Sequence, residues 1–222
     1  MPSGINSLDI YPSSDARCAM LVNASWSTTR GDESTNSASF DSVAATGAIG
    51  PSHTTGRGGG YANSRLVLPF VLSGVPIGAT VTSVKLFLKA TLTSTNKMVP
   101  LKSTSTGSLG NADYGSAFSV LNTETGDYEM EEYKEATAIS TSGTTMTLNS
   151  TAISDVQSNI AQSDNFKIII VGERDFTNTQ PASNTNYAVS LYRVAQSGTS
   201  SDPKLTVEYT TDDNALFFGA NF

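Results

Sequence analysis

The 222-residue sequence predicts an all-β protein, a two-sheet antiparallel β-sandwich of jelly-roll type with one short helix. Apolar and polar residues alternate through 80–92 and 204–210, and a period of two is typical of a half-buried strand. The segment 165–174 is continuously apolar at its centre, which indicates a strand covered on both faces. Polar turns separate about nine or ten such runs, as expected of a sandwich.

The predicted strands follow one another with little helix between them. In chain order they cover residues 5–11, 17–26, 64–72, 80–92, 97–102, 116–121, 143–148, 165–174, 186–195 and 204–210. The strands at 64–72 and 80–92 flank a short Gly/Pro turn, so we expect them to form a hairpin. The acidic segment 127–136 fits either a turn of helix or a solvated strand.

One convincing helix is predicted, over residues 151–162. Its apolar residues recur at i, i+3 and i+7, so they share one face of a helix that packs on the core. Ser150 or Thr151 can supply the N-terminal cap, because a hydroxyl oxygen there accepts from a free backbone N–H.

The sequence predicts a single domain over residues 1–210, with a long insertion or loop at about 27–63. Ser, Thr, Gly and Ala dominate that stretch, and GRGGG at 56–60 indicates a flexible turn. Long loops in compact domains are often functional, so 27–63 is a candidate contact region.

Residues 211–222 form a predicted C-terminal tail in which apolar residues follow a polar break. Such a peptide can fold back on its own core or dock on a partner, since soluble monomers rarely leave such groups exposed. The candidate docking residues are Leu216, Phe217, Phe218 and Phe222.

The charge balance restricts the partners. The formal net charge is −7 and no cluster of Lys and Arg occurs, which argues against binding to nucleic acid and to an anionic membrane.

One cysteine, Cys18, excludes an intrachain disulfide. The first residues lack the basic and apolar regions of a secretory signal, and no apolar run approaches the ~20 residues of a membrane span. We therefore expect synthesis in the cytoplasm.

The residue inventory argues against catalysis. The one histidine, His53, stands in a Gly/Ser/Thr-rich segment, and no G-x-S-x-G motif occurs. A nucleophile needs an adjacent base, and a transition-metal site needs several His or Cys ligands. We therefore expect no catalytic residues, no cofactor and no enzymatic activity.

Calcium is the one ion that the sequence leaves open, because it needs only carboxylates and carbonyls. Asp127, Glu129, Glu131 and Glu132 lie close together in sequence. They lack EF-hand spacing, so a solvated acidic face is the preferred interpretation.

Carbohydrate binding would require aromatic faces that stack on sugar rings. Tyr114, Tyr128 and Tyr133 are the candidate stacking residues. Tyrosine is also an ordinary strand residue, and one sequence does not show which of the three share an exposed face.

The segment from Ser64 to Leu92 contains a strand with Arg and Phe, a Val-Pro-Ile-Gly-Ala turn, and an alternating strand. The positions concerned are Arg65, Phe70, Val75, Pro76, Ile77, Gly78, Ala79, Val81, Ser83, Val84, Leu86 and Leu88. The helix at 151–162, a strand ahead of Gly172 and a closing Pro-Lys-Leu-x-Val-x-Tyr at 203–209 follow. This arrangement resembles DNRLRE-type domains, a β-sandwich family that includes disaggregatase-related repeats and carbohydrate-binding modules.

The resemblance covers roughly residues 64–210. It departs at 27–63, and in the middle of the chain, where DYEMEEYKE stands and the expected tryptophan is missing. It implies a β-sandwich used for surface display or for binding, often to polysaccharide, and it does not imply hydrolysis.

Two functional hypotheses follow. The first is a non-enzymatic structural virion protein of a bacteriophage, namely a capsid decoration, fibre or tail component. It would be made in the host cytoplasm and would contact other virion proteins or further copies of itself as a homo-oligomer. The second is a carbohydrate-binding or adhesion module of an extracellular protein. The two coincide if a virion protein binds host surface glycan.

Overall fold

The computed structural model describes residues 4–13, 17–31, 39–41, 46–57, 59–105, 111–193 and 200–211. The strands are β1 (Asn6–Ile10), β2 (Arg17–Asn23), β3 (Ser39–Asp41), β4 (Thr46–Thr54), β5 (Gly60–Val71), β6 (Thr80–Leu88), β7 (Lys97–Lys102), β8 (Val120–Leu121), β9 (Tyr128–Glu129), β10 (Thr137–Ala138), β11 (Thr144–Thr147), β12 (Asn165–Gly172), β13 (Thr185–Asn186), β14 (Val189–Tyr192) and β15 (Lys204–Thr210). The helices are α1 (Trp26–Arg30), the 3-10 helix η1 (Asn111–Ala117), α2 (Ser150–Gln162) and α3 (Glu173–Phe176).

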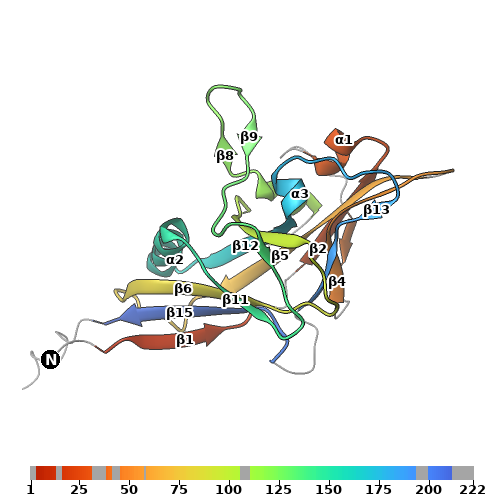
Figure 1. Ribbon diagram of the computed structural model, residues 1–222. Helices are drawn as coiled ribbons and strands as arrows, with labels where there is room; N and C mark the ends of the chain where they lie inside the picture. The colour runs from red at the N-terminus through yellow and green to blue at the C-terminus, as the bar shows by residue number, and fades with distance from the viewer. Residues whose placement is uncertain are drawn as a thin grey trace, which may run out of the picture.

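Two antiparallel sheets pack in a sandwich-like arrangement, which confirms the predicted fold class (Figure 1). The smaller sheet has the order β1-β15-β6-β11, and the larger contains β10-β7-β12-β5-β2-β3. Strand β4 joins the larger sheet beside β5 and also pairs with β13 and β14. The third pair, β8 and β9, is a small hairpin that projects from the body of the sandwich.

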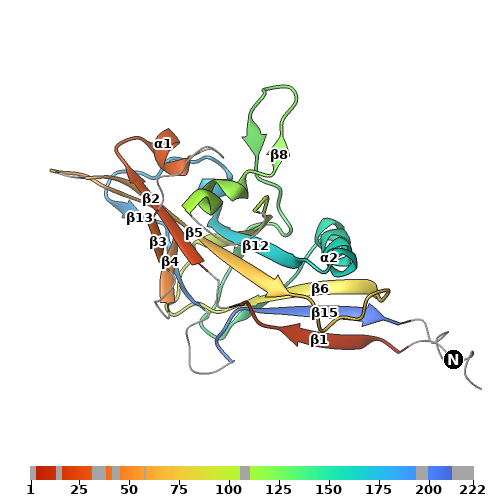
Figure 2. The ribbon, with the colours of Figure 1, turned by 180° about the vertical axis from the view of Figure 1, so that it is seen from behind.

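The long strand β5 organises the larger sheet, as the view from behind shows (Figure 2). Its first half pairs with β4 and its second half with β12, while β2 runs along its opposite edge. Because side chains alternate along a strand, β5 contributes side chains to both faces of the larger sheet. Leu66, Leu68 and Phe70 face the smaller sheet, whereas Arg65 and Val67 face the other way.

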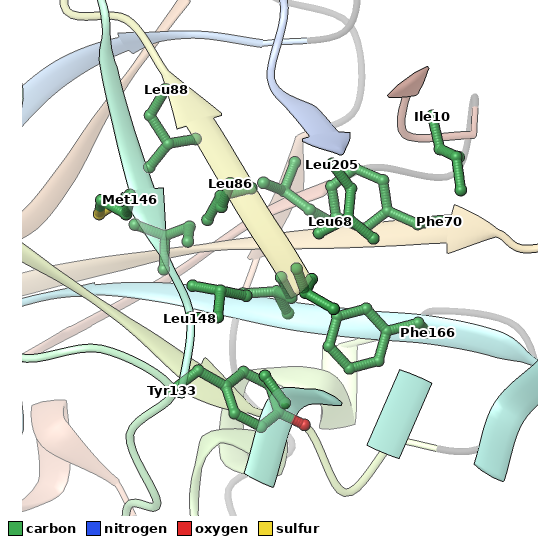
Figure 3. Packing of buried hydrophobic residues seen from close by; sticks show 14 of the residues in the cluster. Ile10, Leu68, Phe70, Leu86, Leu88, Tyr133, Met146, Leu148, Phe166 and Leu205 are labelled. Carbon is green, nitrogen blue, oxygen red and sulfur yellow. The ribbon is translucent and has the colours of Figure 1, made fainter. Parts of the chain in front are cut away.

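The main core lies between the two sheets (Figure 3). Leu86 and Leu88 of β6 and Leu205 of β15 meet Leu68 and Phe70 of β5 there. All five side chains are buried, and each such side chain contributes roughly 1.5–3 kcal/mol through burial. The alternation predicted for 204–210 is thus confirmed for its inward-facing residues.

A second, smaller cluster covers the outer face of the larger sheet. Its buried residues are Val67, Val99, Leu101, Ala117, Phe118, Met130, Ile169 and Val171. They come from β5, β7 and β12 and from the segments that cross over them, η1 and the β9 region. The prediction that 165–174 is covered on both faces is confirmed, since β12 is buried from Phe166 to Gly172.

Helix α2 closes one side of the sandwich by packing Ala152, Val156 and Ile160 into the main core. The helix was predicted, but its cap was not. Asn149, rather than Ser150 or Thr151, accepts a hydrogen bond from the backbone N–H of Ala152 at 3.1 Å. Within the described residues no helix is long and apolar enough to cross a membrane.

Two organisational predictions are wrong. The strands at 64–72 and 80–92 do not form a hairpin, because β5 belongs to the larger sheet and β6 to the smaller one. The Gly/Pro turn between them therefore crosses from one sheet to the other. The stretch 27–63 is not one long loop, since β3, β4 and the start of β5 lie within it.

We predict that Gly143→Ala destabilises the fold strongly. Gly143 has a φ of +98°, and a Cβ there would lie 2.3 Å from the Phe87 ring. Strain and overpacking together should lower the free energy of unfolding by about 3 kcal/mol in urea titrations. Gly78 is the matched control, because its φ is +87° and an added Cβ would have no atom within 4 Å. Gly78→Ala should cost only about 1 kcal/mol; equal losses would contradict the contact with Phe87.

Candidate functional site

The most unusual feature of the structure is an arginine buried in the middle of a sheet. Arg65 stands in β5 between Ser64 and Leu66 and is fully inaccessible to solvent. The two-residue period of the strand turns its side chain to the outer face of the larger sheet. A buried charge is tolerated only when it is paired and hydrogen-bonded, so its partners define the site.

Asp175 of α3 is the charged partner of Arg65. The Nε of Arg65 donates to Oδ2 at 2.7 Å, and Nη2 donates to Oδ1 at 2.8 Å. This bidentate geometry is the strongest form of an Arg–carboxylate pair. Although burial alone would lower it, the pKa of Arg65 is raised because Asp175 stabilises the charged guanidinium.

Tyr114 of η1 completes the enclosure of the guanidinium. Its ring lies 4.0 Å from the Arg65 guanidinium carbon, and its backbone carbonyl accepts from Nη1 at 2.6 Å. Asn63, two residues before Arg65 on the same face of β5, donates 2.8 Å hydrogen bonds to both the Tyr114 hydroxyl and Asp175 Oδ2. Burial raises the pKa of Tyr114, so this hydroxyl stays protonated and donates to the Thr29 carbonyl.

The same network fixes the C-terminal end of α1. Helix ends leave carbonyl groups without intrahelical partners. Arg65 Nη2 donates to the Arg30 carbonyl at 2.7 Å, and Tyr114 donates to that of Thr29. Ser25 caps the other end by accepting from the Thr28 N–H at 3.1 Å. Arg30, the last residue of this short helix, is thus held at a defined place.

Arg30 lies at the boundary between this network and solvent. Its Nε donates to the Asp175 backbone carbonyl at 2.9 Å, and its guanidinium carbon lies 5.0 Å from the centroid of the Phe118 ring. Partial burial lowers the pKa of Arg30, and the like charge of Arg65 acts in the same direction. The same Nε lies 3.7 Å from the Asp175 carboxylate, and the terminal nitrogens of Arg30 make no hydrogen bond to any described residue.

A cleft of about 400 Å³ opens beside Arg30. Its lining residues are Arg30, Thr125, Asp127, Tyr128, Glu129, Met130, Phe176, Thr177 and Asn178. One wall is α1 and α3, and the other is the projecting β8–β9 hairpin (Figure 1). We call this space, with those nine lining residues, the hairpin cleft.

The hairpin cleft combines an exposed aromatic ring with fixed polar groups. Tyr128 is 40% exposed on the hairpin wall, next to the exposed carboxylates of Asp127 and Glu129. On the opposite wall, Asn178 accepts a 3.1 Å hydrogen bond from the indole N–H of the buried Trp26. A ring for stacking, a guanidinium donor and carboxylate acceptors are groups that recognise a polyhydroxylated ligand.

The structure separates the three predicted stacking tyrosines. Tyr128 lies in the cleft, but Tyr114 and Tyr133 are buried, so the prediction that their faces stack on a glycan is wrong for this conformation. Tyr114 serves the Arg65 network instead. Tyr133 belongs to the main core, and its hydroxyl donates to Asp155 Oδ2 at 2.7 Å. Burial raises the pKa of Tyr133, and Asp155 adds to this effect.

The acidic residues considered for calcium do not converge. Glu131 lies 3.8 Å from Lys102, whereas Glu129 accepts a hydrogen bond from Asn122 on the hairpin. Within the described ranges, no three His, Cys, Asp or Glu side chains are grouped so that they could hold a metal ion.

Among the described residues, His53 makes no hydrogen bond to a nucleophile or to an acid that would orient it. It belongs to β4, where its ring stacks on Tyr61 with centroids 4.0 Å apart. Its Nδ1 is buried and has no hydrogen-bond partner among the residues that the structure describes. This arrangement gives His53 a packing role.

The Arg65–Asp175 pair was not predicted from the sequence. Its one local signal was a charged residue directly before the apolar run Leu66–Val71 of a predicted strand. Asp175 gave no local signal in the sequence, because acidic residues commonly follow strands.

The predicted docking residues Leu216, Phe217, Phe218 and Phe222 lie outside the described residues.

Comparison of the chain with models of known protein families and with curated protein sequences found no match.

We predict that breaking the buried pair is costly. Arg65→Met removes the bidentate partner of the buried Asp175 carboxylate and leaves it, among the described residues, only the Asn63 amide and Arg30 at 3.7 Å, so the free energy of unfolding should fall by about 3–5 kcal/mol in urea titrations. The double variant Arg65→Met/Asp175→Leu should lose less than the sum of the two single variants, since neither charge is then left alone.

Lys85→Met provides the control for this double-mutant cycle. Lys85 pairs with Glu208 across the smaller sheet, where both side chains are partly exposed. Such a pair contributes only about 0–1 kcal/mol. Strict additivity of the Arg65 and Asp175 losses would refute the coupling.

Proposed function

We propose that this protein is a non-catalytic binding module that recognises glycan through the hairpin cleft. The observation that carries the proposal is the position of Arg30. Its guanidinium is anchored through Nε, while its terminal nitrogens make no hydrogen bond to the described residues. These donors share the cleft with the exposed ring of Tyr128.

The chemistry of a sugar ring matches these groups. A pyranose presents an apolar face of C–H groups, which packs on an aromatic ring, and hydroxyls around its edge, which both donate and accept. Tyr128 supplies the ring, Arg30 supplies donors, and Asp127 and Glu129 supply acceptors. Arg30 requires little ordering on binding, because the buried network already fixes it, and preorganisation increases affinity.

Two further arguments support binding rather than catalysis. The groups around the cleft do not include a nucleophile hydrogen-bonded to a base among the described residues, and His53 is stacked on Tyr61 elsewhere. The resemblance of 64–210 to DNRLRE-type domains also implies display or binding, often to polysaccharide.

A structural role in a bacteriophage virion is the second candidate. The observation that favours it is the projecting hairpin, which carries the exposed apolar residues Val120 and Leu121 (37% and 50% exposed) away from the body. An exposed apolar arm of this kind suits contact with a neighbouring subunit. In this role the protein would decorate a capsid or form part of a fibre or tail, and glycan binding would attach it to the host.

We predict that Tyr128→Ala weakens glycan binding at least about tenfold, which corresponds to about 1.4 kcal/mol. Arg30→Gln should have an effect of similar size, because it removes the fixed donors. Affinity is measured by isothermal titration against a panel of soluble polysaccharides and by glycan array. Tyr11→Ala is the matched control, since Tyr11 is similarly exposed (38%) but does not line the cleft. If the unaltered protein binds no glycan, or if Tyr11→Ala and Tyr128→Ala are equally harmful, the proposal fails.

The structural role makes a separate prediction. Size-exclusion chromatography with light scattering should show a concentration-dependent oligomer, and Leu121→Asp should shift it to monomer. Leu92→Asp is the control, because Leu92 is also exposed (70%) but is not on the hairpin. A strict monomer at all concentrations would count against assembly through the hairpin and would leave glycan binding as the remaining function.

A further inference from the structure

One end of the sandwich exposes apolar side chains that nothing in the described residues covers. Ile5, Val71 and Ile77 are 71%, 45% and 75% exposed, respectively. Ile5 precedes β1, Val71 is the last residue of β5, and Ile77 belongs to the crossing from β5 to β6. The packing of Leu8 of β1 against Gly74 brings the crossing to that edge of the smaller sheet. We call the part of the surface formed by Val71 and Ile77 the apolar end.

A groove of about 170 Å³ opens at the apolar end, between the crossing and the C-terminal turn of α2. Apolar side chains form much of its lining, and polar groups of 163–165 form part of its rim. The lining residues are Val71, Leu72, Ser73, Val75, Ile77, Asn159, Ile160, Ser163, Asp164 and Asn165. An apolar cavity of about 150 Å³ holds one benzene ring, so this groove has room for one phenylalanine side chain.

The described chain ends beside this groove. Thr210, the last residue of β15, pairs with Thr80, the first residue of β6, and Ile77 lies three residues before Thr80. Paired residues are about 5 Å apart and three residues span at most about 11 Å, so Thr210 lies within about 16 Å of Ile77. Leu216 follows Thr210 by six positions in the sequence, and six Cα–Cα steps can span about 20 Å when extended.

We propose that the groove at the apolar end is the docking site for the chain's own C-terminal segment, Leu216–Phe222. This segment supplies three phenylalanines and one leucine, the chemistry that the groove accepts. The short connection makes docking intramolecular, and its effective concentration is then in the millimolar range, which favours it over docking from a second copy. Burial of the apolar end removes an exposed patch that would otherwise promote aggregation.

Cysteine cross-linking tests this proposal directly. In a Cys18→Ser background of the full chain, Ile77→Cys is combined with Phe217→Cys. Mild oxidation should form an intrachain disulfide in the monomer fraction, at least about tenfold faster than for the control pair Leu92→Cys with Phe217→Cys. Leu92 is as exposed as Ile77 but follows the opposite end of β6. Equal rates for the two pairs would overturn the proposal, as would disulfides that form only between chains and depend on protein concentration.

Hydrogen exchange supplies a second measurement that leaves Cys18 unchanged. Amides of 71–79 and 159–164 should exchange at least about tenfold faster when Phe217→Asp, Phe218→Asp and Phe222→Asp are combined in the full chain, whereas β12 stays protected. Unchanged exchange at the groove would overturn the proposal. Neither result depends on glycan binding, because the groove and the hairpin cleft share no lining residue.

Discussion

The buried pair of Arg65 and Asp175 is the interaction on which the outer layer of this molecule depends. The pair adds little net stability, because the desolvation of two charges offsets most of their attraction, and an apolar pair of similar volume is often at least as stable. Its main effect is to fix the orientation of the elements around it. A guanidinium with directed donors accepts only one arrangement of α3, η1 and α1 around it, and four of its five N–H donors are used by Asp175, Tyr114 and Arg30.

The elements that meet at this pair are too short to hold themselves. Helices α1 and α3 have five and four residues, well below the length at which an isolated helix forms in water. Their orientation therefore comes from tertiary contacts, namely the Arg65 donor to the end of α1 and the Asp175 carboxylate on α3. The wall of the hairpin cleft that carries Arg30 is consequently an extension of the sheet. Arg30 is held from beneath, because its Nε donates to the Asp175 backbone carbonyl and lies 3.7 Å from the buried Asp175 carboxylate.

Many of the strands could be predicted from the sequence, because the side chains on one face of a strand recur at every second residue. The predicted strand at 97–102 coincides with β7, and the helix at 151–162 differs from α2 by one residue. Alternation gives the face of a residue and not the partner of its strand. The crossing between β5 and β6 was for this reason mistaken for a hairpin, although its eight residues are longer than the two-residue turns that favour direct pairing.

The candidate site was harder to predict from the sequence, because its residues are far apart along the chain. Residues 30, 65, 114 and 175 meet through long-range packing, and no local spacing connects them. Tyr114 and Tyr128 look equivalent in sequence, yet one is under a guanidinium and the other is on a hairpin. Only burial distinguishes them, and burial follows from how η1 and the hairpin cross the sheet. A charged residue directly before the apolar run Leu66–Val71 was the single local sign of the site.

The two walls of the hairpin cleft differ in the contacts that fix them. This difference determines how much each wall contributes to the affinity for a ligand. The wall with Arg30 is fixed by the buried network. The hairpin is held mainly by its own ladder, in which the Ser119 N–H donates to the Glu129 carbonyl at 2.9 Å and the Asn122 N–H donates to that of Asp127 at 2.7 Å. A two-stranded hairpin is only marginally stable by itself, so a ligand that contacts Tyr128 must also order it, and that cost reduces affinity. Discrimination between ligands therefore rests on the Arg30 wall, whereas the hairpin adds contact area.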